Sequence, residues 1–146
     1  MSHRAWQTTC IATLAILCFQ TAPARGALGA LAAGLREVME GNLAAYNHKD
    51  VGASMHTVDS RSPDYASTKR AIEEQFKDLD VTTQLVAFDY IGHDDEFAVA
   101  RTKVKSTGKP GTGFTDNTVD AIVIFHQENG AWKLWSEEVL GVDLAQ

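Results

Sequence analysis

Residues 117–142 read NTVDAIVIFHQENGAWKLWSEEVLGV, and this stretch decides the fold. On both sides of the Asn129–Gly130 pair, β-branched and aromatic residues are frequent, which is typical of strands. An Asn-Gly pair favours the tight turn of a β-hairpin, because both residues tolerate a positive φ. The stretch therefore predicts two antiparallel strands, 117–127 and 131–142, joined by a short turn.

The segments upstream of this hairpin complete the expected fold class. Apolar residues recur at every second position within 81–91 and 97–106, which predicts two more strands. Before them, residues 28–49 carry apolar side chains at spacings of three and four, as an amphipathic helix does. Two shorter helices are expected at 51–56 and 66–78. Helices followed by strands predict an α+β domain with an antiparallel sheet.

The first residues have the pattern of a secretory signal. Arg4 precedes an apolar stretch over 10–19, and Ala22 and Ala24 form an A-x-A cleavage site. We therefore predict a cleaved signal peptide over 1–24, one domain over 25–146, and a periplasmic or secreted location. Both cysteines, Cys10 and Cys18, fall within the signal, so the exported chain is expected to contain no disulfide or thiolate site.

The formal charge of the chain is −6 at pH 7. An acidic surface repels phosphate backbones and anionic lipids, so we expect no nucleic-acid partner and no membrane contact after signal cleavage. The histidines lack a metal-binding spacing, and the Gly-rich loop at 107–113 lacks the ending of a phosphate-binding loop. The sequence therefore predicts no metal and no cofactor.

The last strand carries two tryptophans whose side chains alternate across the sheet. Regular alternation places Trp132 on the inner face with Leu134, and Trp135 on the opposite face. Trp132 is expected to pack between sheet and helix. Trp135 would be costly if left open to water, so we expect it in a homodimer interface. The same alternation allows only one of Glu137 and Glu138 to point inward.

Three segments in this order resemble the nuclear transport factor 2-like (NTF2-like) superfamily, also called the cystatin-like α+β cone. They are "MHTVD" at 55–59, "TKRAIEEQF" at 68–76 and "NGAWKLW" at 129–135. The group includes ketosteroid isomerase and polyketide cyclases. The resemblance implies a curved sheet of about four long strands wrapped around a long N-terminal helix, with two shorter helices. It also implies a pocket at the open end of the cone, and dimers packed through the sheets.

Polar residues expected to line that pocket come from several segments. Tyr46, His56, Asp59 and Asp120 are the candidates for catalysis, with His56 and Asp59 forming a His–carboxylate pair. Arg101 is expected to reach Asp120 on the neighbouring strand, as an ion pair or as an anchor for a carboxylate ligand. The full expected lining is Tyr46, His56, Asp59, Arg101, Asp116, Asp120, Trp132 and Glu138.

Three function classes stay open at the level of sequence. The first is an exported domain that binds a small hydrophobic or acidic molecule without covalent chemistry. The second is a pocket enzyme of isomerase or cyclase type, with His56 or Asp59 as base and Tyr46 as donor. The third is a dimerisation or protein-interaction module that uses the sheet face around Trp135.

Overall fold

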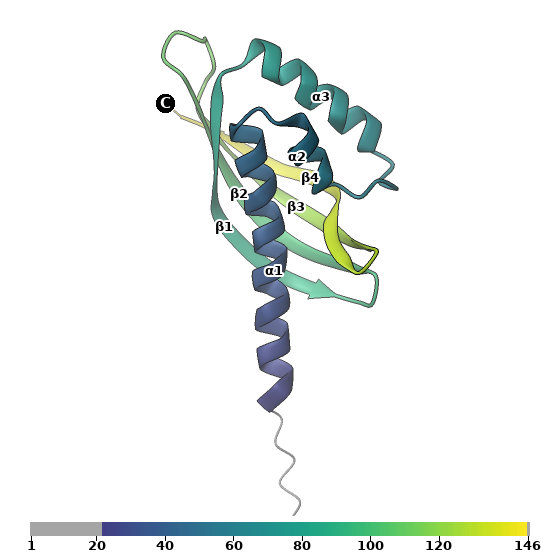
Figure 1. The fold of residues 1–146 in the computed structure, drawn as a ribbon. Helices are drawn as coiled ribbons and strands as arrows, with labels where there is room; N and C mark the ends of the chain where they lie inside the picture. Colours follow the sequence, from purple (N-terminus) through teal and green to yellow (C-terminus); the bar gives the residue numbers. More distant parts are fainter. Residues whose placement is uncertain (1–21, 146) are drawn as a thin grey trace, which may run out of the picture.

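The computed structural model describes residues 22–145, and all of its helices precede its strands (Figure 1). The predicted α+β class is confirmed. The elements are α1 (Ala22–Asn47), α2 (Val51–His56), α3 (Tyr65–Asp78), β1 (Val81–His93), β2 (Phe97–Gly108), β3 (Asn117–Glu128) and β4 (Ala131–Leu144). The four strands form one antiparallel sheet in the order β1-β2-β3-β4.

The sheet is curved because both of its edge strands contain bulges. Shifts of register leave Val86 and Ile91 unpaired in β1, and Trp135 and Leu140 unpaired in β4. Each bulge bends its strand and increases the local twist. The strands therefore wrap around α1, which crosses the inner face of the sheet (Figure 1).

The apolar stripe of α1 forms the centre of the core. Leu35 is fully buried and packs against Ala98 and Ala100 of β2 and Val123 and Phe125 of β3. The alanines on β2 leave room for the helix to approach the sheet closely. This contact confirms the amphipathic helix that the spacing predicted.

The first turns of α1 begin earlier than the sequence indicated and extend past the sheet (Figure 1). Residues 26–30 are exposed. The predicted signal peptide lies outside the described residues except for Ala22–Ala24, which form the start of α1, so its cleavage stays a prediction. None of the described helices combines the length and the apolar character needed to cross a membrane.

The hairpin and the helix caps follow local sequence signals. Asn129 and Gly130 have φ angles of 52° and 81°, so the predicted turn is confirmed. Asp50 caps α2 by accepting a hydrogen bond from the backbone N–H of Ala53 at 2.9 Å.

The loop after α2 is fixed along the edge of β4. The backbone N–H of Asp59 donates to the carbonyl oxygen of Leu134, and that of Leu134 donates to the carbonyl oxygen of Thr57, both at 2.8 Å. Val58 forms a parallel bridge with Leu134 and joins Met55 and Ile72 in a second small core. This attachment places the start of α3 beside the inner face of β4.

Candidate functional site

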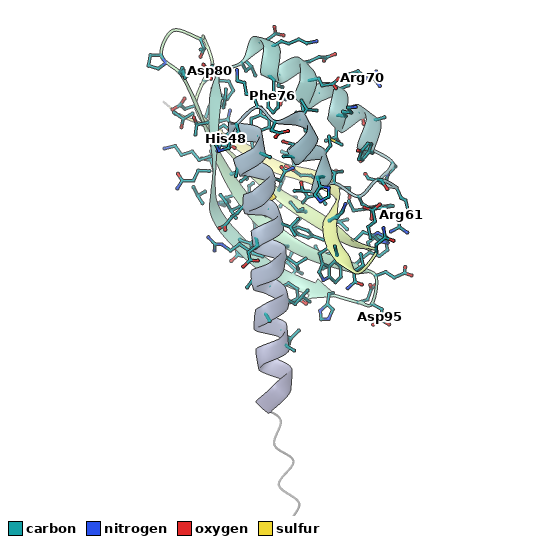
Figure 2. The ribbon with its side chains drawn as sticks, in the orientation of Figure 1. His48, Arg61, Arg70, Phe76, Asp80 and Asp95 are labelled. Atoms are coloured by element: carbon teal, nitrogen blue, oxygen red, sulfur yellow. The ribbon has the colours of Figure 1, made fainter. Side chains whose placement is uncertain are left out.

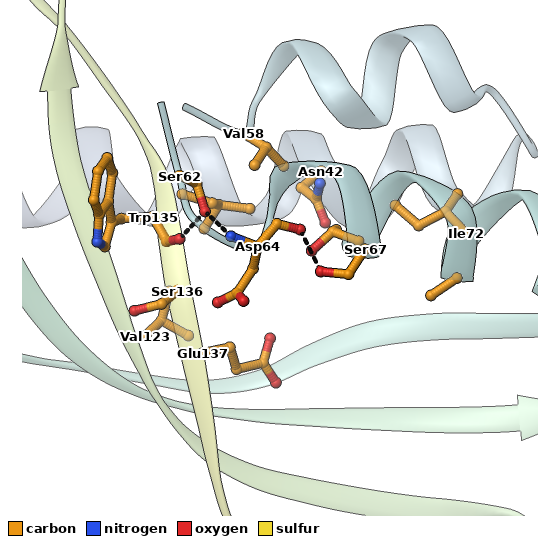
Figure 3. Close-up of a pocket in the computed structure, with 13 residues that line it drawn as sticks. Asn42, Val58, Ser62, Asp64, Ser67, Ile72, Val123, Trp135, Ser136 and Glu137 are labelled. Atoms are coloured by element: carbon orange, nitrogen blue, oxygen red, sulfur yellow. Dashed lines mark hydrogen bonds between the residues drawn. The ribbon is translucent and has the colours of Figure 1, made fainter. Parts of the chain in front are cut away.

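A cavity of about 410 Å³ lies between α3 and the inner face of β4 (Figure 3). Its wall combines apolar side chains with hydroxyl, amide and carboxyl groups. The lining residues are Asn42 of α1, Val58, Ser62 and Asp64 of the loop, Ser67, Thr68, Ala71 and Ile72 of α3, Val123 of β3, and Leu134, Trp135, Ser136 and Glu137 of β4. A volume between about 300 and 1,000 Å³ is typical of small-molecule sites.

Hydrogen bonds hold one rim of this cavity in place (Figure 3). The hydroxyl of the buried Ser62 donates to the carbonyl oxygen of Trp135 at 2.6 Å and accepts from the backbone N–H of Asp64 at 3.1 Å. The hydroxyl of Ser67 donates to the carbonyl oxygen of Asp64 at 2.9 Å. The backbone of Asp64 is thus tied to both β4 and α3.

A bulge in β4 decides which glutamate reaches the cavity. Ile124 pairs with Ser136 and Phe125 with Leu134, so Trp135 is the extra residue between them. Beyond the bulge the alternation is shifted by one, and Glu137 stands opposite Val123, whose side chain belongs to the core. The expected inward residue was Glu138. The structure corrects this, because Glu137 lines the cavity and Glu138 pairs with Ile122 on the outer face.

The environment of Glu137 changes its acidity. Its side chain is exposed to solvent, but the neighbouring cavity walls reduce its hydration. This desolvation raises the pKa of the Glu137 carboxyl above its ordinary value. Among the described residues, no lysine, arginine or histidine lines the cavity to offset the effect.

Tyr46 and His56, two of the predicted catalytic residues, lie elsewhere. The Tyr46 hydroxyl donates to Oε1 of Gln75 at 2.9 Å, and its ring meets Phe76 edge-on at 5.0 Å. Phe76 extends from α3 toward α1 (Figure 2). Burial raises the pKa of Tyr46. His56 is exposed at the end of α2 and lines a different hollow, between α2 and α3.

Asp59 is fully buried, and its partner is His126 rather than the expected His56. The Asp59 Oδ2 lies 2.6 Å from Nδ1 of His126, while Oδ1 accepts from the backbone N–H of Arg61 at 2.8 Å. The Arg61 guanidinium lies 3.3 Å from both carboxylate oxygens and donates to the carbonyl oxygen of Gln127 at 3.0 Å. Figure 2 shows Arg61 beside the turn between β3 and β4.

The balance of these contacts sets the charge of Asp59. Burial acts to raise the pKa of the carboxyl, but the hydrogen bonds from His126 and Arg61 outweigh it and hold the pKa below its ordinary value. Asp59 is therefore an anion that joins the loop to β3. It does not line the cavity between α3 and β4.

The other predicted pocket residues also occupy structural positions. The predicted ion pair is confirmed, since Arg101 contacts Asp120 through Nε at 2.8 Å and Nη2 at 2.7 Å. Both belong to the outer-face rows of β2 and β3. An Asp116 carboxylate oxygen accepts from the backbone N–H of Gly108 at 2.9 Å and so closes the loop between these strands.

The two tryptophans differ in their surroundings. Trp132 packs against the core around Leu35, as expected. Trp135 is half-buried, with ring centroids 4.8 Å from His126 and 5.8 Å from Phe97. Its own chain therefore covers part of the ring for which the sequence predicted a dimer contact.

None of the eight pocket residues predicted from the sequence lines the cavity. The polar side chains of its wall come from positions that were not among those eight. Ser62 and Asp64 belong to "DSRSPDY", which reads as a turn. Ser67 and Thr68 look like ordinary polar positions on an exposed helix. The pair Glu137–Glu138 was the usable signal, because one of the two had to face inward. Within the described part of the chain, no three acidic, histidine or cysteine side chains gather to hold a metal ion.

Comparison with known proteins adds a family and a fold. Residues 37–144 match the family model described as "Anti-sigma-I factor RsgI9, C-terminal domain". None of the curated proteins matches the chain in sequence.

Solved structures similar to this chain share the fold at low sequence identity. An NTF2-like protein with a cystatin-like fold from Novosphingobium aromaticivorans has a TM-score of 0.63 at 13% identity, over 80% of this chain and 84% of that protein. A proposed scytalone dehydratase from the same species has a TM-score of 0.64 at 9% identity, over 84% and 89%. A protein of unknown function with a cystatin-like fold from Nostoc punctiforme has a TM-score of 0.63 at 10% identity, over 76% and 90%.

Proposed function

The chain belongs to the family of the anti-sigma-I factor RsgI9 C-terminal domain and has the NTF2-like fold, and from this premise we propose that it is a small-molecule-binding domain. The ligand occupies the cavity between α3 and β4 and is bound without covalent chemistry. We place this activity outside the cytoplasm, because residues 1–24 have the pattern of a secretory signal.

The observation that carries the proposal is the composition of the cavity wall. Val58, Ile72 and Leu134 provide an apolar surface, while Ser62 and Thr68 add hydroxyl groups. An apolar pocket with a few polar groups is the usual form of a small-molecule site, since burial supplies affinity and the polar groups fix orientation. The hydrogen-bonded rim means that the site exists before the ligand arrives.

The positions of the candidate catalytic groups support binding rather than turnover. Tyr46 is engaged with Gln75, His56 faces another hollow, and Asp59 is held by His126 and Arg61. A general base must come within hydrogen-bond reach of the proton it removes. These three side chains do not converge on one ligand position.

Blocking the cavity tests the proposal. Ala71 lines the cavity from the exposed face of α3, so the Ala71→Trp variant fills part of it. Ala66 is exposed on the same helix and does not line the cavity, so Ala66→Trp is the matched control. In a thermal-shift screen of small organic molecules, ligands are expected to raise the Tm of the wild type and of Ala66→Trp but not of Ala71→Trp. Equal shifts in all three proteins contradict a site in this cavity.

A pocket enzyme is the second candidate, and Glu137 is the observation in its favour. A carboxyl group whose pKa is raised by desolvation can donate or accept a proton closer to neutral pH. The acid–base role then passes from His56 and Asp59 to Glu137. If the wild type converts a cavity ligand, and Glu137→Gln loses this turnover but still binds the ligand, then Glu137 is the reacting acid. Unchanged turnover in that variant excludes Glu137 as the reacting acid.

The third candidate is self-association through the outer face of the sheet. The described helices pack on the inner face (Figure 1), so none of them covers the outer-face row of β3, with Ile122 and Ile124. A second copy of the chain would cover these side chains, as sheet-packed dimers do. We propose this homodimer in addition to ligand binding, since the two use opposite faces.

A further inference from the structure

We propose that the ligand of the cavity between α3 and β4 is an organic cation, held by Asp64 and Glu137 through its charged group. This inference rests on the proposed function and names its ligand class. It replaces the hydrophobic or acidic molecule that the sequence indicated. The fold directs two carboxylates into the cavity, and neither of them has a side-chain partner among the described residues.

Asp64 occupies the N-cap position of α3, where an aspartate normally accepts a hydrogen bond from the first turn. Its side chain makes no such bond. The backbone of Asp64 is instead fixed by Ser62 and Ser67, and the carboxylate lies over the cavity (Figure 3). The helix thus gives up a capping interaction that normally stabilises its first turn.

Glu137 reaches the same cavity from the opposite wall (Figure 3). The bulge at Trp135 is what turns it inward. Among the described residues neither Glu137 nor Asp64 forms a side-chain hydrogen bond or ion pair. The remaining elements of the wall add no charge of either sign, since α1 supplies Asn42 and β3 supplies Val123.

The electrostatic consequence is a negative potential in the cavity, where both acids keep contact with solvent. A carboxylate ligand would be repelled there, whereas a cation would interact favourably with both acids. A bound cation also removes the cost that Glu137 bears when it ionises in the cavity. Val58, Ile72 and Leu134 then contact the hydrocarbon part of the ligand.

The N-terminus of α3 is the feature that opposes this assignment. Helix N-termini attract anions through their free N–H groups and the helix dipole. Here Asp64 itself places a carboxylate at that end of α3, which already supplies negative charge to the dipole. An added anionic ligand would have to displace or neutralise that carboxylate.

Three probes of matched shape separate these cases in calorimetric titrations. Tyramine carries an ammonium group, tyrosol carries a hydroxyl at the same place, and 4-hydroxyphenylacetate carries a carboxylate. We expect tyramine to bind at least tenfold more tightly than tyrosol, and the acid to bind most weakly. The preference for tyramine is expected to increase as the pH rises through the raised pKa of Glu137, because ionisation completes the site.

The variant Asp64→Asn/Glu137→Gln should lose the preference for tyramine over tyrosol while still binding tyrosol. Glu138→Gln is the control, since Glu138 is the neighbouring acid on the outer face and should leave the preference unchanged. Tyrosol binding as tightly as tyramine overturns the inference and leaves the proposed function intact. Tightest binding of the acid overturns it in favour of an anion site at α3.

Failure of tyramine to bind also overturns the inference, whatever else binds. The proposed function fails by a different result, namely that no compound of the screen distinguishes Ala71→Trp from Ala66→Trp. The two failures can therefore be told apart, because they are measured with different variants and different compounds.

Discussion

Asp59 shows how the surroundings of one residue decide its role. The carboxylate is fully buried, and each of its oxygens has a protein partner. Because a buried charge is tolerated only when it is paired, the contacts with His126 and Arg61 are a condition for burying it at all. The sequence suggested that Asp59 is a catalytic base. In the structure its carboxylate instead joins the loop after α2 to β3 through His126.

We expect Asp59→Asn to lower the free energy of unfolding by about 1–3 kcal/mol, because hydrogen bonds to a charged group are lost in a buried place. The folded-state pKa of Asp59 is depressed, so its contribution to stability is fully present above the pKa of the unfolded chain. It is lost as the pH falls from that value through the depressed folded-state pKa. Urea unfolding of both proteins between pH 7 and pH 3 measures the effect, and the difference between them should shrink at the acidic end.

Asp95→Asn is the control, since Asp95 is exposed in the turn between β1 and β2 (Figure 2). This change should alter stability by less than about 0.5 kcal/mol. An Asp59→Asn variant as stable as the wild type at pH 7 would show that the buried contacts contribute nothing net.

At the scale of single elements, α1 depends on a few contacts with the sheet. Leu35 is 0% exposed, whereas Leu28, two turns earlier on the same helix, is 44% exposed. We expect Leu35→Ala to lower the free energy of unfolding by about 2–5 kcal/mol, through lost burial and the cavity left behind. Leu28→Ala should change it by less than about 0.5 kcal/mol. Similar losses in both variants, measured by urea unfolding, would contradict the packing of α1.

The hairpin between β3 and β4 depends on the backbone of its turn. Gly130 has a φ of 81°, a conformation that side chains disfavour, although a Cβ there would meet open space. Gly130→Ala is therefore expected to cost about 1–2 kcal/mol of stability from backbone strain alone. Gly141→Ala is the control, because Gly141 also has open space but no positive φ. If thermal unfolding shows equal Tm values for the two variants, the turn is not strained in this way.

All seven elements could be predicted from sequence because their signals are local. Spacings of three and four marked the helices, alternation marked the strands, and Asn129–Gly130 marked the turn. The polar contacts of the site could not be predicted in the same way. Asp59 and His126 are 67 residues apart, and only the closure of the loop onto β4 brings them together. A single bulge at Trp135 then exchanged the inward roles of Glu137 and Glu138.

At the scale of the whole molecule, the two faces of the sheet differ in what lies against them. The inner face is covered by α1 and, beyond it, borders the cavity under α3. The outer face carries the ion pair between Arg101 and Asp120 beside a half-buried apolar residue, Ile122. Such a surface resembles a subunit interface, where an apolar centre is bordered by charges. The cavity and the proposed dimer contact can therefore form independently.

We expect the wild-type chain to be a dimer in light scattering and Ile122→Glu to weaken that dimer at least tenfold, because the change buries a charge at the centre of the contact. Ile91→Glu is the matched control, since Ile91 is 59% exposed on the edge strand β1. Tyramine binding should persist in the Ile122→Glu monomer, as the cavity lies on the opposite face. A wild type that stays monomeric at high concentration contradicts the dimer. Loss of both association and binding in Ile122→Glu would instead show that the two faces are coupled through β3.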